Sequence, residues 1–457
     1  MIKVVYVLFS ICVMGLSAFL FHRAAGSLSL KKLNIVSFTF YNLLVFTYVG
    51  AFAILMGFRD HYLVKKIQDD SIIIKTCWMI AYVLIMLPLA INLFERLFLK
   101  GSVRKRFQDY CLAAVEYKDT ERNVLIFTIV ALLICALGTV YLFYQIGTVP
   151  IFAVYLQGED GDMIRQEASR NFQGNTYIKN ILVLGITPLL SYLSYIYLRV
   201  GRRRRRIWIP VFGFSFLLCC LIKTYDLEKA PVLYYLFYFY LIEIVLNNRK
   251  LMKILYFIIG TVVCLVVIMY VSAGYGESFL TISSGPGGRI FMTQVATLFL
   301  HVKAFPKMHA YLNGASLPTA LAKLVGSSDS WIRSGRIVME LFNKEAVKQG
   351  IAGVMNALFI GEAYANWGIA GTLISPWVVA ATIAITLVLQ LRLPKTPINM
   401  VINIALVSSL TGALQGGFVD YLYNVSLILI LLLFWGISVL VRRGKIRIYH
   451  QLPIKEE

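Results

Sequence analysis

The stretch Gly361-Glu-Ala-Tyr-Ala-Asn-Trp-Gly-Ile-Ala-Gly371 ends the one long segment, 274–371, that cannot cross a bilayer as a simple helix. Its small residues allow close approach of backbones, and its glutamate, tyrosine, asparagine and tryptophan present polar and aromatic groups where the chain re-enters the membrane. Nearly all of the remaining sequence is apolar enough to be membrane span. Because ionisable groups are costly beside hydrocarbon unless they serve a purpose, we expect any chemistry to lie in this segment.

The composition is that of an integral membrane protein. Of its 457 residues, 59% are hydrophobic and only 15% are charged, and the mean hydropathy is +0.74. Soluble domains carry about 25% charged residues. The predicted fold class is therefore an all-α polytopic membrane protein with 11 to 12 transmembrane helices of about 20 residues each. The eleven segments recognised are 4–21, 35–57, 71–94, 124–146, 178–198, 207–222, 231–247, 254–272, 368–390, 398–417 and 422–440.

Basic residues divide the loops into a rich set and a poor set. The rich set holds 26 of the 44 Lys and Arg residues and consists of 22–34, 95–123, 199–206, 249–253, 392–395 and the tail after Val441. The poor set, which consists of Lys3 and the loops 58–70, 147–180 and 223–230, holds nine, and the loop 418–424 holds none. Because cytoplasmic loops carry the excess of Lys and Arg, we predict an external N-terminus and a cytoplasmic C-terminus.

This topology divides the chain into three parts. Residues 1–272 form an N-terminal membrane bundle of about eight spans, and 368–457 form a C-terminal bundle of about three spans with a basic cytoplasmic tail. Between them, 273–367 form a large extracytoplasmic segment. Its pattern predicts helices over Ile290–Phe305, from Leu317 to about Gly326, and over Ser334–Gln349, lying on the membrane as a helical cap.

Several classes of protein and site are excluded or disfavoured. The net charge of +21 would suggest a nucleic-acid partner in a soluble protein, but the run Arg202–Arg206 is a membrane-orientation signal here. Nucleotide-binding motifs and paired metal-ligand cysteines are absent from the sequence, so we expect no cofactor and no structural zinc. Asp160-x-Asp162 could hold a divalent cation, but a solvated turn is the simpler interpretation, and we expect no metal.

Charged residues near the outer membrane surface supply the candidates outside the long segment. Arg165 and Arg170, in an external loop, are candidates for sugar contact. Lys229 opens a span in a short charged connection, where it either pairs internally or lines an anion-binding cavity. Lys75 lies a few residues inside the third span, close enough to the outer surface to extend its ammonium group there.

Four motifs resemble the O-antigen polymerase (Wzy) family of oligosaccharide repeat unit polymerases. They are Lys229-Ala-Pro231 opening a span, Arg289-Ile-Phe291 starting a loop helix, Phe305-Pro306 closing that helix, and the stretch 361–371. The resemblance also covers the arrangement of many spans with one long outer loop. It differs in that Trp367 stands where phenylalanine is usual.

The resemblance implies polymerisation of a surface polysaccharide at the outer face of a bacterial cytoplasmic membrane. A glycan on undecaprenyl pyrophosphate is transferred to a second lipid-linked repeat unit, so the expected partners are lipid-linked oligosaccharide, the bilayer, a flippase and a chain-length regulator, without nucleic acid. Arg289 and Lys229 would stabilise the diphosphate leaving group, and Glu362 would accept the proton of the acceptor hydroxyl. Further substrate contacts are expected from Arg165, Arg170, Arg336, His309, Tyr364, Asn366 and Trp367.

Two other functions compete with this one. A ligase that transfers the same lipid-linked glycan to another lipid shares the chemistry. A flippase or another transporter belongs to a different class, in which short loops and internal repeats are usual, and neither is evident here. For His301 and His309 a structural or interface role is the favoured interpretation, and Glu362 either pairs with an arginine or points into a polar cavity.

Overall fold

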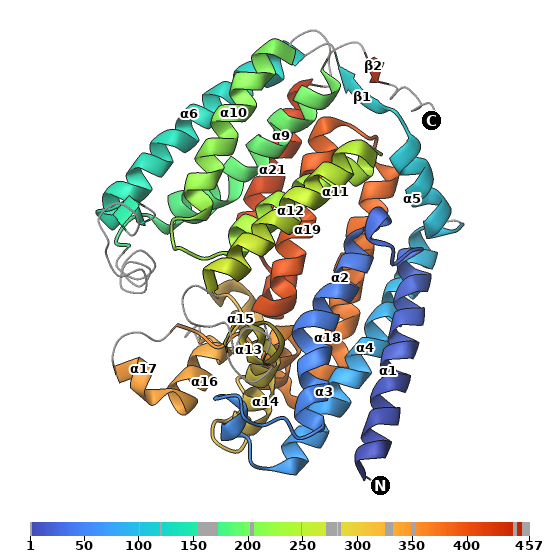
Figure 1. Ribbon diagram of the computed structural model, residues 1–457, viewed down its shortest axis with the longest axis vertical. Coiled ribbons are helices and arrows are strands. Elements are labelled where there is room, and N and C mark those ends of the chain that lie inside the picture. Colours follow the sequence, from blue (N-terminus) through green and yellow to red (C-terminus); the bar gives the residue numbers. More distant parts are fainter. Residues whose placement is uncertain are drawn as a thin grey trace. The chain divides into compact units, whose positions relative to one another are not determined.

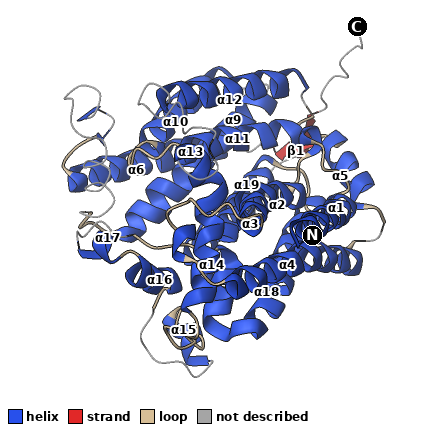
Figure 2. Ribbon diagram, turned by 60° about the horizontal axis from the view of Figure 1, so that its bottom comes forward, coloured by secondary structure: helices blue, strands red, loops and turns tan. Residues whose placement is uncertain are grey.

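Helices coincide with each of the eleven predicted spans in the computed structural model of the protein (Figure 1). Nine of them, within the residues described, are long and apolar enough to cross a membrane, which confirms an all-α polytopic membrane protein. Of the other two, α11 has 16 residues and α12 has 22. Helix dominates the view in Figure 2, where β1 is the labelled strand. The structure describes residues 2–99, 101–118, 121–150, 152–153, 172–201, 205–247, 249–270, 281, 285–324, 332–348, 353–441 and 446–449.

The chain packs into two compact units that are each built from separate parts of the sequence. Unit 1 comprises Met1–Phe107, Val267–Leu389 and Val407–Asn424, and unit 2 comprises Gln108–Val266, Gln390–Leu406 and Val425–Glu457. The long segment therefore packs together with the first spans in unit 1. The three-part division by membrane topology remains a prediction.

Unit 1 contains the early spans and most of the long segment. Its elements are α1 (Ile2–Ala25), η1 (Leu30–Lys32), α2 (Ile35–Leu43), η2 (Leu44–Tyr48), α3 (Val49–Leu55), η3 (Val64–Lys66), α4 (Asp70–Phe98), α13 (Gly285–Gly288), η6 (Arg289–Thr293), α14 (Gln294–Ala304), α15 (Thr319–Leu324), α16 (Ser334–Phe342), α17 (Lys344–Lys348), α18 (Leu358–Arg392), the end of α19 (Pro397–Gly416) and α20 (Val419–Leu422). The start of α5 (Val103–Leu112) also belongs to it.

Side chains at the helix ends explain where several of these elements begin and stop. Asn34 caps α2, because its side chain accepts from the N–H groups of Val36 and Ser37. Asp69 caps α4 through the N–H of Ser71. Pro306 follows the last turn of α14, as predicted, because proline cannot continue the ladder of helical hydrogen bonds.

Helix α14 is buried inside unit 1, which differs from the expectation of a cap lying on the membrane. Residues 295–302 are all buried, and the helix packs against α3, α4 and α16. Gly50 of α3 lets η6, the turn just before α14, come close, because a side chain at position 50 would overlap the carbonyl oxygen of Phe291. The apolar pattern of this stretch thus reflects contact with other helices.

The other two helices of the long segment differ from the prediction in their described bounds. Helix α15 begins at Thr319, two residues after Leu317, and its predicted end at Gly326 lies outside the described residues. The helix predicted over 334–349 is broken at Asn343, whose φ of −138° and ψ of 58° are not helical, and it forms α16 and α17. A single non-helical residue of this kind leaves no trace in the apolar periodicity.

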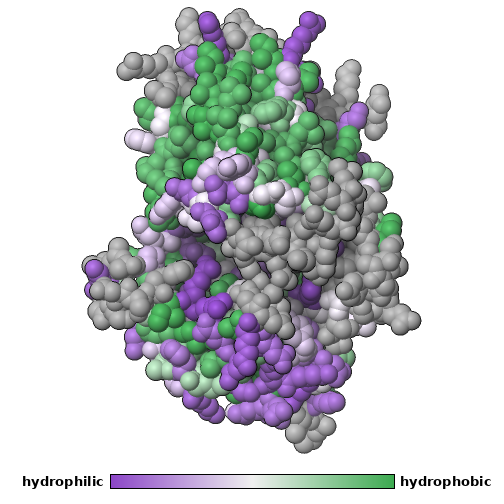
Figure 3. Space-filling model, turned by 90° about the vertical axis from the view of Figure 1, so that its left-hand side faces the viewer, coloured by the Kyte–Doolittle hydropathy of each residue, from purple (hydrophilic) through white to green (hydrophobic). Residues whose placement is uncertain are grey.

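Unit 2 contains the middle spans and the last one. Its elements are the end of α5, β1 (Val115–Lys118), α6 (Glu121–Ile146), η4 (Ile178–Ile186), α9 (Thr187–Val200), α10 (Arg205–Lys223), α11 (Ala230–Val245), α12 (Arg249–Tyr270), the start of α19, α21 (Val425–Val441) and β2 (Ile446–Tyr449). Helix α6 exposes a long apolar stripe that includes Leu133, Leu137 and Val140. Hydrophobic residues cover a wide area on the side of the molecule where α6 lies (Figure 3), as expected for a surface in contact with lipid.

Loops assigned to one side of the membrane by charge lie together within each unit. In unit 2, β1 pairs with β2 of the tail, and Lys395 donates to the carbonyl oxygens of Cys111 and Ala113 at 2.9 and 2.7 Å. All of these belong to the predicted cytoplasmic set. In unit 1, Lys303 donates to the carbonyl oxygen of Lys66 at 2.5 Å, which joins two predicted outer segments.

Candidate functional site

The candidate site is at the end of unit 1 where the predicted outer segments meet. It is built from the first half of α18, the 305–318 connection, the first turns of α4 and the junction of α19 with α20. Glu362 of α18 accepts a hydrogen bond from the N–H of Val419 at 3.0 Å, and Lys75 of α4 donates to the hydroxyl of Tyr364 at 2.7 Å. Segments far apart in sequence are therefore joined by polar contacts.

Helix α18 is broken where the stretch 361–371 crosses from the site to the span. Trp367 has φ −133° and ψ 16°, and Gly368 has φ 59° and ψ −137°. The positive φ favours glycine, and a side chain at this position would lie 2.8 Å from the ring of Tyr311. The first half, Leu358 to Asn366, is thus a separate short helix that presents the site residues.

Asn366 anchors the 312–316 loop to the end of that short helix. Its side-chain oxygen accepts from the N–H of Gly314 at 3.0 Å, and its amide nitrogen donates to the hydroxyl of Ser316 at 2.7 Å and to the carbonyl of Glu362 at 2.9 Å. The side chain is completely buried. Asn366, predicted as a substrate contact, therefore holds protein groups in place.

Glu362 is half-buried and lies next to charged neighbours. Arg333 and Asp420 both interact electrostatically with its carboxylate. Gly417 leaves room for it, because a side chain there would come within 2.3 Å of Oε2. Glu362 therefore has an arginine near it and is partly exposed.

Trp367 covers one side of this region. Its ring meets that of Phe418 edge to face, with centroids 6.1 Å apart, and it packs against the buried cluster of Leu317, Ala322 and Val419. The indole is only partly buried, so one part of it remains available for stacking.

Tyr364 points to a different set of neighbours from Glu362. It is completely buried, donates to the carbonyl oxygen of Phe305 at 3.2 Å, and its ring lies 4.8 Å from the ammonium of Lys75. Tyr311 meets it edge to face with centroids 5.9 Å apart. Lys75, predicted to extend to the outer surface, turns toward this tyrosine pair.

Arg289 is exposed at the start of η6 and lies near the loop between α3 and α4. It interacts electrostatically with Tyr62, which partly offsets the rise in the pKa of Tyr62 caused by burial. Beside Tyr62, burial lowers the pKa of His61 to about 4, and the imidazole lies 3.4 Å from the hydroxyl of Thr293. The neighbours of Arg289 are thus different from those of Glu362.

The remaining candidates of the long segment have local partners. Arg336 forms an ion pair with Glu340 at 2.7 Å, one turn along α16. His309 is half-buried and its Nδ1 lies 2.8 Å from the carbonyl oxygen of Ala310. His301 is fully buried with Nδ1 2.8 Å from the carbonyl oxygen of Thr297, and burial lowers its pKa to about 4. These positions fit structural histidines.

Three candidates lie elsewhere. Lys229 is half-buried at the start of α11 in unit 2. Arg165 and Arg170 lie outside the described residues, as do Asp160 and Asp162. Among the residues that are described, no group of three His, Cys, Asp or Glu side chains could hold a metal ion.

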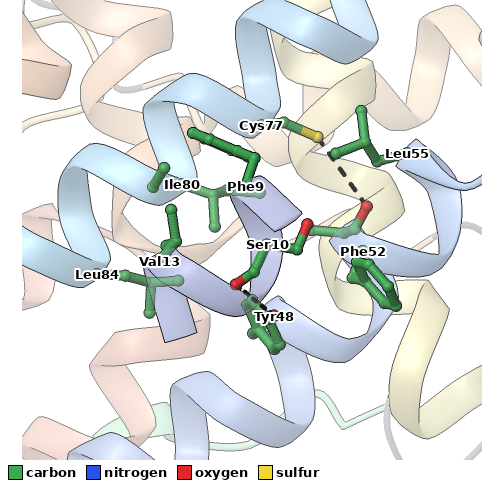
Figure 4. Close-up of a pocket in the computed structure, with 11 residues that line it drawn as sticks. Phe9, Ser10, Val13, Tyr48, Phe52, Leu55, Cys77, Ile80 and Leu84 are labelled. Atoms are coloured by element: carbon green, nitrogen blue, oxygen red, sulfur yellow. Dashed lines mark hydrogen bonds between the residues drawn. The ribbon is translucent and has the colours of Figure 1, made fainter. Parts of the chain in front are cut away.

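A groove between α1, α3 and α4 is apolar and is not the candidate site. Figure 4 shows Phe9, Val13, Phe52 and Leu84 among its lining residues, and its polar groups are occupied locally, as in the 2.9 Å bond from Tyr48 to the carbonyl of Ser10. Its mostly apolar lining gives no reason to place chemistry there.

Sequence reasoning did not assign Arg333, Asp420 or Tyr311 to the site, and it expected Lys75 only to extend to the outer surface. Asp420 and Arg333 could have been noticed as charges close to span ends, but nothing in their spacing relates them to Glu362. Comparison of the chain with family models, with curated proteins and with solved structures finds no match.

Proposed function

We propose that this protein is a membrane glycosyltransferase that polymerises polyprenyl-diphosphate-linked oligosaccharide repeat units at the outer face of a bacterial cytoplasmic membrane. The observation that carries the proposal is the setting of Glu362. A half-buried carboxylate, positioned by the Val419 N–H and next to Arg333, lies at the predicted outer end of the membrane spans. Resemblance to the O-antigen polymerase family supports the same function.

In the proposed reaction, the acceptor hydroxyl oxygen attacks the anomeric carbon of the donor glycan. The new glycosidic bond forms as the bond from that carbon to the lipid diphosphate breaks, and Glu362 takes the proton of the hydroxyl. The diphosphate leaves with its own charge, so it needs cations more than a proton donor. Arg289, exposed in unit 1, is our candidate for this stabilisation, and for Lys229, in unit 2, the same role remains what the resemblance implies.

Buried neighbours give the site its geometry. Asn366 fixes the loop that carries Ser316, and Ser316 interacts with Glu362. Trp367, with part of its indole exposed, offers a surface on which a sugar ring could stack. Arg336 and His309 remain secondary candidates for glycan contact.

Complementation tests this proposal. In a strain from which the gene has been deleted, we expect the Glu362→Gln variant to lose long-chain polymer, with a fall in rate of roughly 100-fold or more because the base is gone. Glu340→Gln is the matched control, since Glu340 is an exposed carboxylate paired with an arginine. Long polymer from Glu362→Gln at normal membrane levels would overturn the assignment.

The deletion strain itself separates polymerase from ligase. Loss of a polymerase should leave single repeat units on the surface lipid, because attachment still occurs. Absence of all repeat units would indicate ligation instead. The measurement is the ladder of surface glycan on a gel.

A further inference from the structure

Lys75 is a cation that lacks an acidic partner in the described part of the chain. Its ammonium donates to the neutral hydroxyl of Tyr364 at 2.7 Å and lies 4.8 Å from the centre of the same ring. It is half-buried six residues into α4, one of the helices long enough to span a membrane. A charge in this position is costly unless a counter-charge or water compensates it.

Two other half-buried lysines of the protein show how the positive charge of such a side chain is compensated. Lys179 in unit 2 also lies over aromatic rings, those of Phe172 and Tyr225 at 4.8 and 5.6 Å, but it interacts with the carboxylate of Asp226. Lys303 in unit 1 donates to a backbone carbonyl at 2.5 Å. Lys75 differs from Lys179 because no acidic side chain is described near it, and with a phenol as its one described acceptor, two of its three N–H donors can serve another group.

The surroundings of Lys75 are suited to an anion. Tyr364 is fixed by its bond to the Phe305 carbonyl, and it holds the ammonium in one place. Tyr311 adds a second phenol beside Tyr364, and burial, together with its hydrogen bond to Tyr364, raises the pKa of Tyr311 to about 12, so it stays neutral. Electrostatic interaction between Tyr311 and Lys75 places the two groups in one cluster.

We propose that Lys75 and Tyr311 form a binding site for a phosphate group of a lipid at the predicted outer surface, with the buried Tyr364 holding the ammonium of Lys75 in place. This inference rests on the proposed function for the identity of the lipid, a polyprenyl diphosphate that carries the glycan. Tyr364 and Glu362 are two residues apart on a helix, so they point to different sides of it. A reaction between two lipid-linked substrates supplies two diphosphates, and this site holds one of them away from the carboxylate.

Binding of short lipids to the detergent-purified protein tests the proposal. The probes are geranylgeranyl diphosphate, geranylgeraniol and dioleoyl phosphatidylglycerol. We expect the diphosphate to bind and the alcohol not to compete with it. Lys75→Met should weaken diphosphate binding by roughly 10- to 100-fold, the effect of one hydrogen bond to a charged group, whereas Lys75→Arg should retain most of it.

Lys179→Met is the matched control, because it removes a half-buried lysine over aromatic rings that already has an acidic neighbour. Diphosphate binding that is the same in Lys75→Met as in the wild type would overturn the site. Equal displacement by phosphatidylglycerol would overturn the substrate assignment and identify a site for bulk lipid headgroups. A monodisperse profile in size-exclusion chromatography shows that each variant is folded.

These outcomes are separable from those of the proposed function. Diphosphate binding that depends on Lys75, together with normal polymer from Glu362→Gln, would keep the site and end the catalytic assignment. Diphosphate binding that does not depend on Lys75, together with loss of polymer from Glu362→Gln, would end the site and keep the catalytic assignment.

Discussion

At the scale of single residues, burial decides which side chains of the long segment can act chemically. Glu362 is half-buried, whereas Tyr364, Asn366 and His301 are completely buried and bonded to protein groups. Buried polar groups of this kind stabilise the fold only when their partners are in place. We therefore separate a group that can meet substrate from groups that position it.

Two buried histidines should make the protein sensitive to acid. Burial lowers the pKa of His301 and of His61 to about 4, from 6.5 in the unfolded chain. The folded state therefore holds both rings neutral, so their contribution to stability is complete above pH 6.5 and is lost as the pH falls toward 4. At pH 5 each histidine should cost about 2 kcal/mol of the free energy of unfolding.

Thermal unfolding in detergent at pH 7.5 and pH 5 measures this effect. The double variant His61→Gln/His301→Gln keeps side chains that can form hydrogen bonds but do not titrate in this range. Its loss of stability between the two pH values should be smaller than that of the wild type. An equal loss in both proteins would contradict the assignment.

At the scale of elements, the break in α18 creates the site. The short helix before the break carries Glu362 and Asn366, and the long helix after it enters the membrane. Gly371 allows the two halves to approach, because a side chain there would overlap the carbonyl oxygen of Ala363. A continuous helix would direct Glu362 elsewhere.

Gly368→Ala should therefore destabilise the protein. The combination of φ 59° and ψ −137° favours glycine and costs on the order of 1–3 kcal/mol for a residue with a side chain, and contact with Tyr311 adds to this cost. Gly412→Ala is the control, because it lies within α19 with nothing within 4 Å of an added methyl group, and alanine favours helix. The measurement is the unfolding temperature in detergent, and equal values for both variants would show that the break tolerates a side chain.

At the scale of the whole molecule, charge and packing agree about the sides of the membrane. In unit 1, two members of the predicted outer set, the 58–70 loop and the long segment, are in contact, and in unit 2 two members of the predicted cytoplasmic set, the 95–123 loop and the tail, are in contact. Packing alone does not say which set is outside. That direction rests on the bias of Lys and Arg.

Cysteine labelling establishes the direction. In a variant without native cysteines, an impermeant maleimide added to intact cells should label Lys344→Cys. It should label Lys105→Cys only after the membrane is permeabilised. Both positions are exposed in the structure, so access depends on the membrane. Labelling of Lys105→Cys alone in intact cells would reverse the orientation.

The sequence by itself determined the class of the protein and the positions of its long apolar helices, and it predicts how the loops group. These follow from local properties, since a span is recognised from about 20 consecutive apolar residues and a cytoplasmic loop from its basic residues. The end of α14 just before Pro306 was also predicted from local sequence, because the proline itself marks it. The pattern also identified Glu362 as a candidate, because a carboxylate beside a span is unusual wherever it occurs.

Only the tertiary structure decided what surrounds each candidate. Lys75 and Tyr364 are 289 positions apart, and Glu362 and Val419 are 57 apart. The apolar pattern of α14 did not distinguish a helix on the membrane from one buried among α3, α4 and α16. Periodicity specifies which face of a helix is apolar, but the residue that meets this face depends on how distant segments pack, and no local pattern contains that choice.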